Sequence, residues 1–252
     1  MKQLIKSLLP DSVLHKYRDL LNRNGVFCPI CKSSFREFGP AGLKERKNAK
    51  CHNCGSLERH RLIFLYLREK FNFLDNKNRN LRLLHFAPKK MFYDLFSNKD
   101  SMIYTPCDLY PENYRFDGNS EVLKVDITNI PFEDESFDFI LCNHVLEHVP
   151  DDNLAMQELF RVMTNNGNGI FQVPIDYTRT KTYEDWSITT PEEREKAFGQ
   201  HDHVRWYGQD YKDRLENVGF DVQEIDYTSK FSSREIFKFG LMSSEKIYHV
   251  TK

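Results

Sequence analysis

Ser136-Phe137-Asp138-Phe139-Ile140-Leu141-Cys142-Asn143-His144-Val145 is a short apolar run whose last part carries two polar side chains, Asn143 and His144. Such a run predicts a buried strand, here over 137–145. A helical pattern follows over 151–163 and a further apolar run over 169–175. This strand, helix, strand order is typical of a parallel sheet that helices cover on both faces.

The same alternation extends in both directions from this stretch. Five further apolar runs have strand length and predict strands at 81–86, 102–109, 122–127, 220–228 and 246–251. Two further helical patterns predict helices at 89–97 and around 210–218. We expect the last two strands to pair antiparallel, so the chain predicts five parallel strands closed by an antiparallel pair.

Two Cys-x-x-Cys pairs precede this α/β region. They are Cys28-Pro29-Ile30-Cys31 and Cys51-His52-Asn53-Cys54, with 19 residues between them, a spacing that fits a four-thiolate zinc site. Four cysteine ligands leave no coordination position for water or substrate, so we expect a structural Zn²⁺ that stabilises a small ribbon. The alternative is a pair of disulfides or a set of free thiols.

The expected compartment favours metal over disulfides. Charge interrupts the N-terminal residues Met1–Lys6 before any apolar run forms, so we expect no secretory signal. No apolar stretch approaches the length of a membrane span. We therefore expect a cytoplasmic, reduced protein. The remaining cysteines, Cys107 and Cys142, each lie near the end of an apolar run and are expected to be buried thiols.

The composition is that of an ordinary globular chain. The 252 residues are 40% hydrophobic and 29% charged, with a formal net charge of −1, which argues against general nucleic-acid binding. The charge is uneven, because Lys32 to Arg61 contains eight basic residues against three acidic ones. This basic segment could contact phosphates or another acidic partner. The alternative is a solvated loop without a binding role.

These patterns predict a division of the chain into consecutive parts. An Asn/Lys-rich stretch at 75–80 follows a helical pattern and is the expected boundary. The predicted parts are an N-terminal helix at 1–24, a zinc ribbon at 25–60, a linking helix and boundary at 61–80, and an α/β domain at 81–252 that carries an insertion at 176–207.

The ordered motifs resemble the zinc-ribbon-bearing members of the class I S-adenosylmethionine-dependent methyltransferases, of the type 11-like group. The resemblance covers nearly the whole chain, and its motifs are Val125–Ile127, Pro131–Phe132, Ser136–Ile140, Asn143–Val149, Glu158–Val162 and Asn166–Gly169. Each motif alone is weak, but the ordered series is specific. The resemblance implies a Rossmann-like, seven-stranded methyltransferase sheet with a small N-terminal zinc ribbon, and S-adenosylmethionine as the cofactor.

The resemblance also implies which strand ends bind the cofactor, because ligands of such sheets lie outside the carboxyl ends of the strands. Asp108, followed by Leu109, looks like the family's ribose-binding acid. Asp126 with Ile127 resembles the pair that binds the adenine amine and packs its ring. The alternative for each aspartate is a turn or a helix cap. Asn143 and His144 would face the methionine end of the cofactor.

The first loop departs from the family pattern. The family usually carries a glycine-rich turn where this chain has Leu84-His85-Phe86-Ala87-Pro88-Lys89-Lys90. Glycines there let the backbone approach the cofactor closely. We still expect His85, Phe86 and Ala87 to line the cofactor site. The alternative is a catalytically degenerate binding module whose ribbon recruits a partner.

The catalytic candidates follow the predicted fourth strand. His144, Glu147 and His148 stand at i, i+3 and i+4, so they would share one face if a helix begins there. Some oxygen methyltransferases bind a divalent ion at this spacing, although a histidine as first ligand disfavours Mg²⁺. Without metal, a histidine would act as general base. The alternative is that Glu147 and His148 only orient the loop.

The insertion at 176–207 lies where the superfamily commonly carries its substrate cover. It combines aromatic residues with the run Gly199–Arg205, a mixture that suits stacking on a sugar or planar ring. We expect Tyr177, Trp186, His203 and Arg205 to contact substrate, with His203 also a catalytic candidate. The alternative is a packed lid whose aromatic side chains form a core.

The predicted function is S-adenosylmethionine-dependent methylation of an oxygen on a sugar, a glycan or another small polar acceptor. The first alternative is a ribosomal-RNA methyltransferase that docks RNA through the basic zinc ribbon. The second is the degenerate binding module described above.

Overall fold

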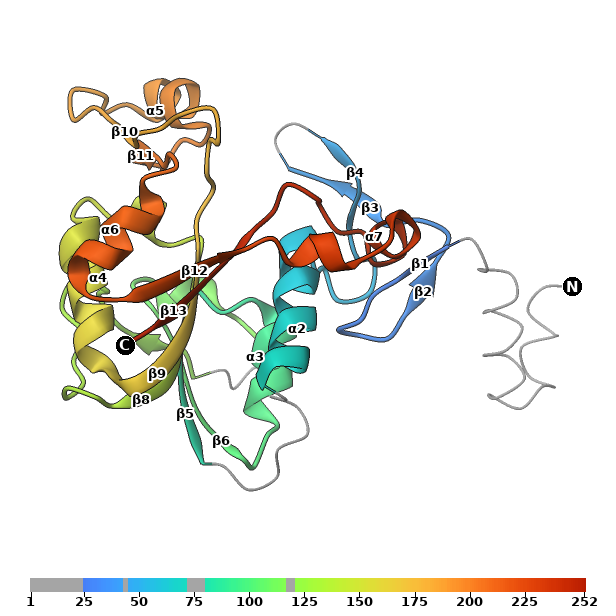
Figure 1. Cartoon of the computed structure of the whole chain (residues 1–252), viewed down its shortest axis with the longest axis horizontal. Helices are drawn as coiled ribbons and strands as arrows, with labels where there is room; N and C mark the ends of the chain where they lie inside the picture. Colours follow the sequence, from blue (N-terminus) through green and yellow to red (C-terminus); the bar gives the residue numbers. More distant parts are fainter. Residues whose placement is uncertain (1–24, 43–44, 72–79, 117–120) are drawn as a thin grey trace, which may run out of the picture. The chain divides into compact units, whose positions relative to one another are not determined.

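A computed structural model describes residues 25–42, 45–71, 80–116 and 121–252. The expected helix at 1–24 lies outside these residues. The chain divides into two compact units (Figure 1). The first contains Met1–Asp75 and Asp226–Glu245, and the second contains Asn76–Ile225 and Lys246–Lys252. Residues 226–245 were expected in the α/β domain at 81–252, whereas the structure places them in the first unit.

The first unit contains two short hairpins. Strands β1 (Val26–Phe27) and β2 (Ser34–Phe35) pair antiparallel, as do β3 (Gly39–Ala41) and β4 (Arg46–Lys50). The buried cluster beside these hairpins consists of Val26, Cys28, Phe38 and Cys51. So small an apolar cluster cannot stabilise a ribbon alone, which is why a bound metal is expected there.

Helix α2 (Glu58–Phe71) completes the first unit with the 3₁₀ helix η4 (Tyr227–Lys230) and helix α7 (Ser233–Phe239). Six consecutive residues of α2, from Leu62 to Leu67, are buried, so the helix is enclosed rather than amphipathic. The expected linking helix is thus present, but it begins before residue 61 and ends at Phe71.

Arg61 of α2 joins the hairpins to the returning segment of the first unit. Its guanidinium is fully buried and donates hydrogen bonds only to backbone carbonyls, those of Ala49, Ser56, Phe239 and Gly240. Because these acceptors come from distant parts of the sequence, one side chain fixes three segments together.

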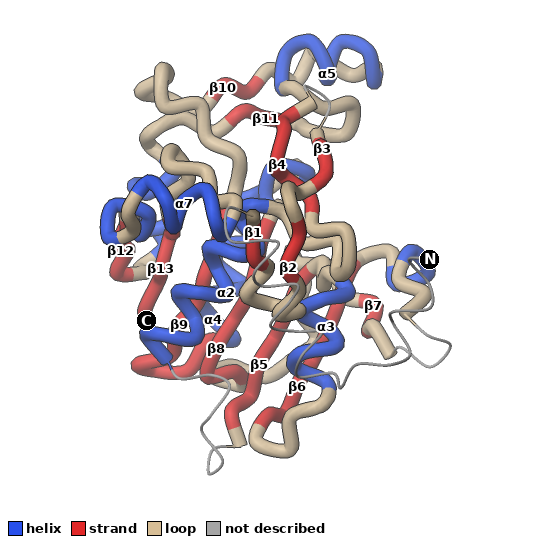
Figure 2. The backbone as a smooth tube through the Cα atoms, turned by 90° about the vertical axis from the view of Figure 1, so that its right-hand side faces the viewer, coloured by secondary structure: helices blue, strands red, loops and turns tan. Residues whose placement is uncertain are grey.

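The second unit is built on a seven-stranded sheet of order β12-β13-β9-β8-β5-β6-β7 (Figure 2). Its strands are β5 (Leu81–Phe86), β6 (Met102–Asp108), β7 (Leu123–Lys124), β8 (Phe137–Asn143), β9 (Met163–Gln172), β12 (Asp221–Ile225) and β13 (Ile247–Thr251). The first five are parallel, and β13 is antiparallel to both of its neighbours. The predicted Rossmann-like methyltransferase sheet is confirmed.

Most strands differ from the predicted ranges, and β7 and β9 differ in ways that the sheet explains. At the sheet edge, β7 has two residues, because after Lys124 the chain bends into a turn in which Asp126 pairs with Asn129. Strand β9 begins at Met163 rather than at 169, and its pairing with β8 is irregular between Phe137 and Phe139. Boundaries of this kind depend on neighbouring strands, which a linear pattern does not contain.

Helices cover both faces of the sheet. Helix α3 (Lys90–Ser97) lies on one face, while α4 (Asp152–Val162) and α6 (Tyr211–Val218) lie on the other (Figures 1 and 2). The side chain of Asp151 caps α4 by accepting a hydrogen bond from the Leu154 N–H. Among the described residues, no helix combines the length and the apolar composition that crossing a membrane requires.

The insertion forms a small structure of its own. Strands β10 (Tyr183–Glu184) and β11 (Arg205–Trp206) pair antiparallel, with helix α5 (Pro191–Phe198) between them in sequence. Thr190 and Glu193 form a complete capping box at the start of α5. The insertion lies beyond the carboxyl ends of the parallel strands (Figures 1 and 2).

Candidate functional site

The register of the sheet brings three expected site residues to one edge. Phe86 of β5 pairs with Cys107 of β6 and with Cys142 of β8. The residues that follow these three in sequence are Ala87, Asp108 and Asn143, and they lie side by side at the carboxyl edge of the sheet. Strand order reverses between β5 and β8, which is where ligands of such sheets bind.

The first loop has a glycine-like backbone although it contains no glycine. Ala87 has φ 50°, in the left-handed region that glycine adopts without steric cost, and its N–H donates to the Cys107 carbonyl at 3.0 Å. Ala87 thus adopts a backbone conformation that glycine adopts more readily. Strain of this kind in an alanine is held by its surroundings and is frequent at ligand sites.

His85 and Phe86 do not present their side chains to this edge, because both are buried. The His85 ring lies against Phe96 and shares a 2.9 Å hydrogen bond between its Nδ1 and the Tyr104 hydroxyl. Burial, with a smaller contribution from the charge of Lys89, lowers the pKa of His85 to about 3. His85 is therefore a neutral side chain packed among aromatic rings.

The Asp108 carboxylate at the end of β6 is held in place from two sides. Oδ1 accepts from the Tyr110 N–H at 2.8 Å, and Oδ2 accepts from the Tyr114 hydroxyl at 2.7 Å. The following side chain, Leu109, is exposed. Each carboxylate oxygen has further lone pairs, so this arrangement can accept hydrogen bonds from the hydroxyls of a ribose.

Asp126 makes the turn contacts that were the alternative to a cofactor role. Its Oδ1 accepts from both the N–H and the hydroxyl of Thr128, at 2.9 and 2.7 Å. The carboxylate itself is exposed, and neighbouring Ile127 is buried. The turn therefore positions Asp126, while its other oxygen faces away from these two bonds.

At the end of β8 the backbone of His144 is strained. His144 has φ 56°, and its N–H donates to the Gln172 carbonyl at 2.7 Å. Glu147 and His148 follow in the 3₁₀ helix η3 (Leu146–His148) rather than in the expected α-helix. The turn nevertheless brings His144 Nδ1 to 3.1 Å from Glu147 Oε1.

Glu147 is a buried, ionised carboxylate. Burial raises the pKa of its carboxyl, but the hydrogen bond from His144 and the electrostatic influence of the His144 and His148 rings outweigh burial, so the pKa lies below its usual value. The side chain is only 1% exposed. A buried carboxylate that keeps its charge has to be balanced by positive or polar groups around it.

Three polar atoms near this strand end lack a partner. Among the described residues, Asn143 Oδ1, His144 Nε2 and Glu147 Oε2 are buried and make no hydrogen bond. Each such atom costs about 1–3 kcal/mol of stability. Their clustering within five residues at the switch point indicates a position that a ligand completes.

His203 of the insertion joins the catalytic candidates from the β8 end. Glu147, His148 and His203 each offer one ligand atom, and these atoms lie within 4.8 Å of one another. The Val204 N–H donates to the Glu147 carbonyl at 2.9 Å, which fixes the insertion against η3. Burial lowers the pKa of His203, so its imidazole is favoured in the neutral form. The structure therefore brings all four predicted catalytic residues together.

Arg205, which was expected to contact substrate, is buried in the structure. It is 1% exposed and donates to the carbonyls of Leu146, Val149 and Pro150, while its Nε donates to Glu184 at 2.6 Å. Every guanidinium nitrogen is thus engaged inside the protein. Arg205 fastens the insertion to the loop that carries Glu147 and His148.

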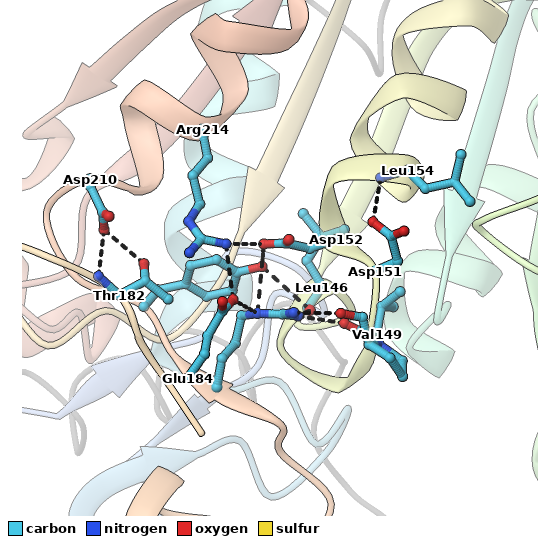
Figure 3. A network of polar contacts seen from close by, with 12 residues as sticks. Leu146, Val149, Asp151, Asp152, Leu154, Thr182, Glu184, Asp210 and Arg214 are labelled. Carbon is cyan, nitrogen blue, oxygen red and sulfur yellow. Dashed lines mark hydrogen bonds and ion pairs between the residues drawn. The ribbon is translucent and has the colours of Figure 1, made fainter. Parts of the chain in front are cut away.

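Further polar contacts near Arg205 also hold the insertion in place, and no sequence motif indicated these contacts. Arg214 of α6 donates to Asp152 at 2.9 Å and to Glu184 at 3.0 Å (Figure 3). Thr182 donates to Asp210 through both its N–H and its hydroxyl (Figure 3). These contacts connect the insertion with α4 and with the start of α6.

Tyr177 and Trp186, the other expected substrate residues, lie on the surface of the insertion. Tyr177 is 36% exposed and Trp186 is 58% exposed. Of the four residues expected to contact substrate, these two present accessible aromatic surface. His203 presents its ring to Glu147 and His148 instead, and Arg205 is fully engaged.

The four cysteines of the first unit form a compact cluster. Their sulfur atoms lie within 4.8 Å of one another, with 3.6 Å between Cys28 and Cys54 and between Cys31 and Cys51. A disulfide requires about 2.05 Å, so all four are free thiols. A tetrahedral zinc with Zn–S bonds of about 2.3 Å separates its ligands by about 3.8 Å, which the cluster matches.

Comparison with known proteins identifies the central part of the chain. Residues 95–171 match the model of a family described as a methyltransferase domain. No curated protein matches the chain significantly.

Solved structures share the fold at low sequence identity. An S-adenosylmethionine-dependent methyltransferase from Mesorhizobium loti is 11% identical with a TM-score of 0.50, covering 76% of this chain and 100% of that one. A putative sarcosine dimethylglycine methyltransferase from Galdieria sulphuraria is 14% identical with a TM-score of 0.45, covering 90% and 91%. A putative methyltransferase from Bacillus halodurans C-125 is 15% identical with a TM-score of 0.42, covering 75% and 96%.

The family match lies inside the second unit and spans β6, β7, β8, α4 and most of β9. The sheet around it has the strand order and the single antiparallel strand β13 of that fold. The second unit therefore has the Rossmann-like methyltransferase fold, and its central part, residues 95–171, matches a methyltransferase domain.

Proposed function

We propose that the protein methylates an oxygen atom of a small polar acceptor, most simply a sugar hydroxyl. The observation that carries the proposal is the group of three buried, unpartnered polar atoms on Asn143, His144 and Glu147. They lie at the switch point of a methyltransferase sheet, on the side that the insertion covers. A polar ligand that hydrogen-bonds these atoms would remove the cost of leaving them unsatisfied.

The cofactor side is supplied by the ends of β5, β6 and β8. S-adenosylmethionine supplies a methyl group on a positively charged sulfur, which is already a reactive donor. Ala87 allows close backbone approach, and the fixed carboxylate of Asp108 accepts from ribose hydroxyls. Asp126 and Ile127 bind and pack the adenine, and Asn143 offers its free Oδ1 at the methionine end. Catalysis then rests on proximity and alignment.

The acceptor side is supplied by His144 and the insertion. Because Glu147 lies at His144 Nδ1, the tautomer with its proton on Nδ1 leaves Nε2 free to accept a hydrogen bond from an acceptor hydroxyl. Tyr177 and Trp186 offer exposed rings on which the apolar face of a sugar can pack. This combination favours a hydroxyl-bearing acceptor.

We also propose that the cysteine cluster holds a structural Zn²⁺. The sulfur separations support tetrahedral coordination, and four thiolates leave no open position. Buried Arg61 has only carbonyls as hydrogen-bond acceptors and lies within electrostatic range of Cys28 and Cys51. A tetrathiolate zinc centre carries net negative charge, which would balance this guanidinium.

RNA is the weaker candidate acceptor. Of the basic residues between Lys32 and Arg61, Arg61 is buried and Arg46 pairs with Glu58 at 2.9 Å, so neither is directed to a phosphate. RNA docking through the remaining residues would give an affinity that falls steeply with salt. Activity on a small acceptor that is insensitive to salt would exclude it.

The test is calorimetric titration of the full-length, zinc-replete protein with S-adenosylmethionine and S-adenosylhomocysteine. Both should bind the wild type, and Asp108→Ala and Asp126→Ala should each weaken binding at least tenfold. Asp134→Ala is the matched control, since that carboxylate is exposed and pairs with Arg161. Failure of the wild type to bind either compound would contradict the proposal and favour the degenerate binding module. An unchanged Asp126→Ala would show that the pocket is misplaced.

A further inference from the structure

We infer that Glu147, His148 and His203 form a second metal site, which binds a divalent transition-metal ion through two imidazole nitrogens and one carboxylate oxygen. The site lies between η3 and the insertion and is separate from the cysteine cluster. Its role at the acceptor rests on the proposed function, whereas ion binding does not.

The three ligand atoms already lie close together. One atom from each residue falls within a 4.8 Å limit, and the rings of His148 and His203 are 4.8 Å apart between centroids. Metal–ligand bonds of about 2.0–2.1 Å place tetrahedral ligands about 3.3 Å apart. Small side-chain rotations would therefore close the site around an ion.

Both histidines are oriented as metal ligands usually are. His203 Nδ1 lies 3.1 Å from the Phe198 carbonyl oxygen. His148 Nδ1 lies 3.3 Å from the Asp202 carbonyl oxygen and 3.3 Å from its carboxylate. An Nδ1–H that donates to a carbonyl or carboxylate fixes the tautomer and leaves the Nε2 lone pair for a metal. Two neighbouring histidines with this same arrangement are hard to explain by packing alone.

The carboxylate lacks one partner. Glu147 is 1% exposed, its Oε1 lies against His144, and its Oε2 makes no hydrogen bond. A buried carboxylate oxygen without a partner is costly, and a cation is the ligand that satisfies it best. This orphaned oxygen is an indication of a ligand that is independent of the histidine geometry.

The donor set indicates the class of ion. Two nitrogens and one oxygen suit Zn²⁺, Co²⁺, Ni²⁺ or Fe²⁺, whereas Mg²⁺ and Ca²⁺ prefer oxygen ligands. Three protein ligands leave at least one coordination position open, as in catalytic metal sites. An acceptor hydroxyl could occupy that position.

The scaffold holds the ligands from both sides. The Val204 N–H donates to the Glu147 carbonyl, and Arg205 donates to the carbonyls of Leu146 and Val149. His203 is thus fixed relative to Glu147 and His148 by bonds that the next two residues, Val204 and Arg205, make to the η3 segment. Such preorganisation is what a specific metal site requires.

The test uses the full-length protein with its cysteine cluster loaded with zinc, titrated with Co²⁺ by calorimetry and by absorption. We expect one Co²⁺ per wild-type chain, with ligand-field bands and no thiolate charge-transfer band. His203→Ala and Glu147→Gln should weaken Co²⁺ binding more than tenfold. His201→Ala is the matched control, because this exposed histidine of the same loop is outside the cluster and should leave binding unchanged.

Three outcomes would overturn the inference: no Co²⁺ binding by the wild type, binding accompanied only by a thiolate charge-transfer band, or unchanged binding in both variants. S-adenosylhomocysteine titration of the same samples reports whether each variant is folded, and Glu147→Gln preserves size should His203→Ala unfold. Cofactor binding without Co²⁺ binding would reject the metal site and leave the proposed function standing. Co²⁺ binding without cofactor binding would do the reverse.

Discussion

The cysteine cluster of the first unit and the Glu147–His148–His203 cluster of the second gather metal-ligand side chains in opposite ways. The first has four ligands of one kind at tetrahedral separation, which leaves no position for another molecule. The second has three mixed ligands, one of which keeps an unpartnered oxygen. The comparison teaches that a cluster of four ligands, which fills every coordination position of an ion, suits a structural role. A cluster of three ligands leaves a position at which another molecule can bind.

Each cluster is accompanied by a buried arginine that binds carbonyls. Arg61 holds the hairpins of the first unit to residues Phe239 and Gly240. Arg205 holds the insertion to the η3 loop, and it also pairs with Glu184. The two clusters thus share one means of support although their chemistry differs. The predictions below test this contrast, from the largest effect to the smallest.

The largest effect is expected from Cys51→Ser. If the cluster holds the proposed zinc, loss of one thiolate should release it and unfold the first unit, since structural zinc contributes roughly 10 kcal/mol or more to folding of such small modules. Metal analysis and hydrogen exchange of residues 26–67 would measure both. Cys107→Ala, which removes a buried thiol outside the cluster, should keep the zinc. If Cys51→Ser retains one zinc per chain, the description of the cluster as a four-ligand site is wrong.

Arg205→Met should destabilise the second unit by about 3–5 kcal/mol, because it leaves buried carbonyls and the Glu184 carboxylate without their partner. Chemical denaturation would measure the loss. Arg179→Ala, at a half-exposed pair with Asp176, should cost less than about 1 kcal/mol. Equal effects of the two substitutions would show that Arg205 is not the fastening residue.

The Glu184 pair predicts a loss of stability in acid. Burial raises the pKa of Glu184, but hydrogen bonds from Arg205 and Arg214 outweigh burial, so the folded-state pKa is lowered. Its stabilisation is therefore fully present above the unfolded value of about 4.3 and is lost as pH falls through the lower folded value. The midpoint temperature of thermal unfolding should fall less steeply from neutral to acidic pH in Glu184→Gln than in the wild type. Parallel curves for the two proteins would contradict this assignment.

The smallest effect on stability is expected from Trp186→Ala. Because Trp186 is exposed, the change in unfolding free energy should stay within about 0.5 kcal/mol. The KM for the acceptor should nevertheless rise, since the ring is proposed to pack on it. Phe237→Ala removes a similarly exposed ring from the first unit and should change neither quantity. An unchanged KM in Trp186→Ala would remove this residue from the acceptor site.

Several features could be predicted because they depend on local pattern. The Cys-x-x-Cys spacing predicted the four-sulfur cluster, and the apolar runs predicted the sheet and its antiparallel strand β13. The spacing of His144 and Glu147 predicted that they would share one face of a helix, and in the structure a left-handed His144 and a 3₁₀ helix bring them into contact. Residues three positions apart lie close together in both an α-helix and a 3₁₀ helix, so their proximity does not depend on which of the two forms.

Other features depend on neighbours that are distant in sequence. Arg205 was expected to contact substrate because it lies in an insertion that mixes aromatic and polar residues, yet its guanidinium donates to the carbonyls of Leu146, Val149 and Pro150. Asp202 received no role, although it lies at His148 Nδ1. Neither the acceptors of a buried arginine nor the partner of a ring nitrogen can be read from spacing.

The sequence by itself therefore determined the fold class, the cysteine cluster and the strand ends that carry the polar residues, because period and spacing are properties of neighbouring residues. Only the tertiary structure decided which polar atoms are satisfied. It engaged Arg205 and left Asn143 Oδ1, His144 Nε2 and Glu147 Oε2 without partners. The physical reason is that hydrogen bonding and burial are set by segments that folding brings together, and a site is defined by the bonds it lacks as well as by those it makes.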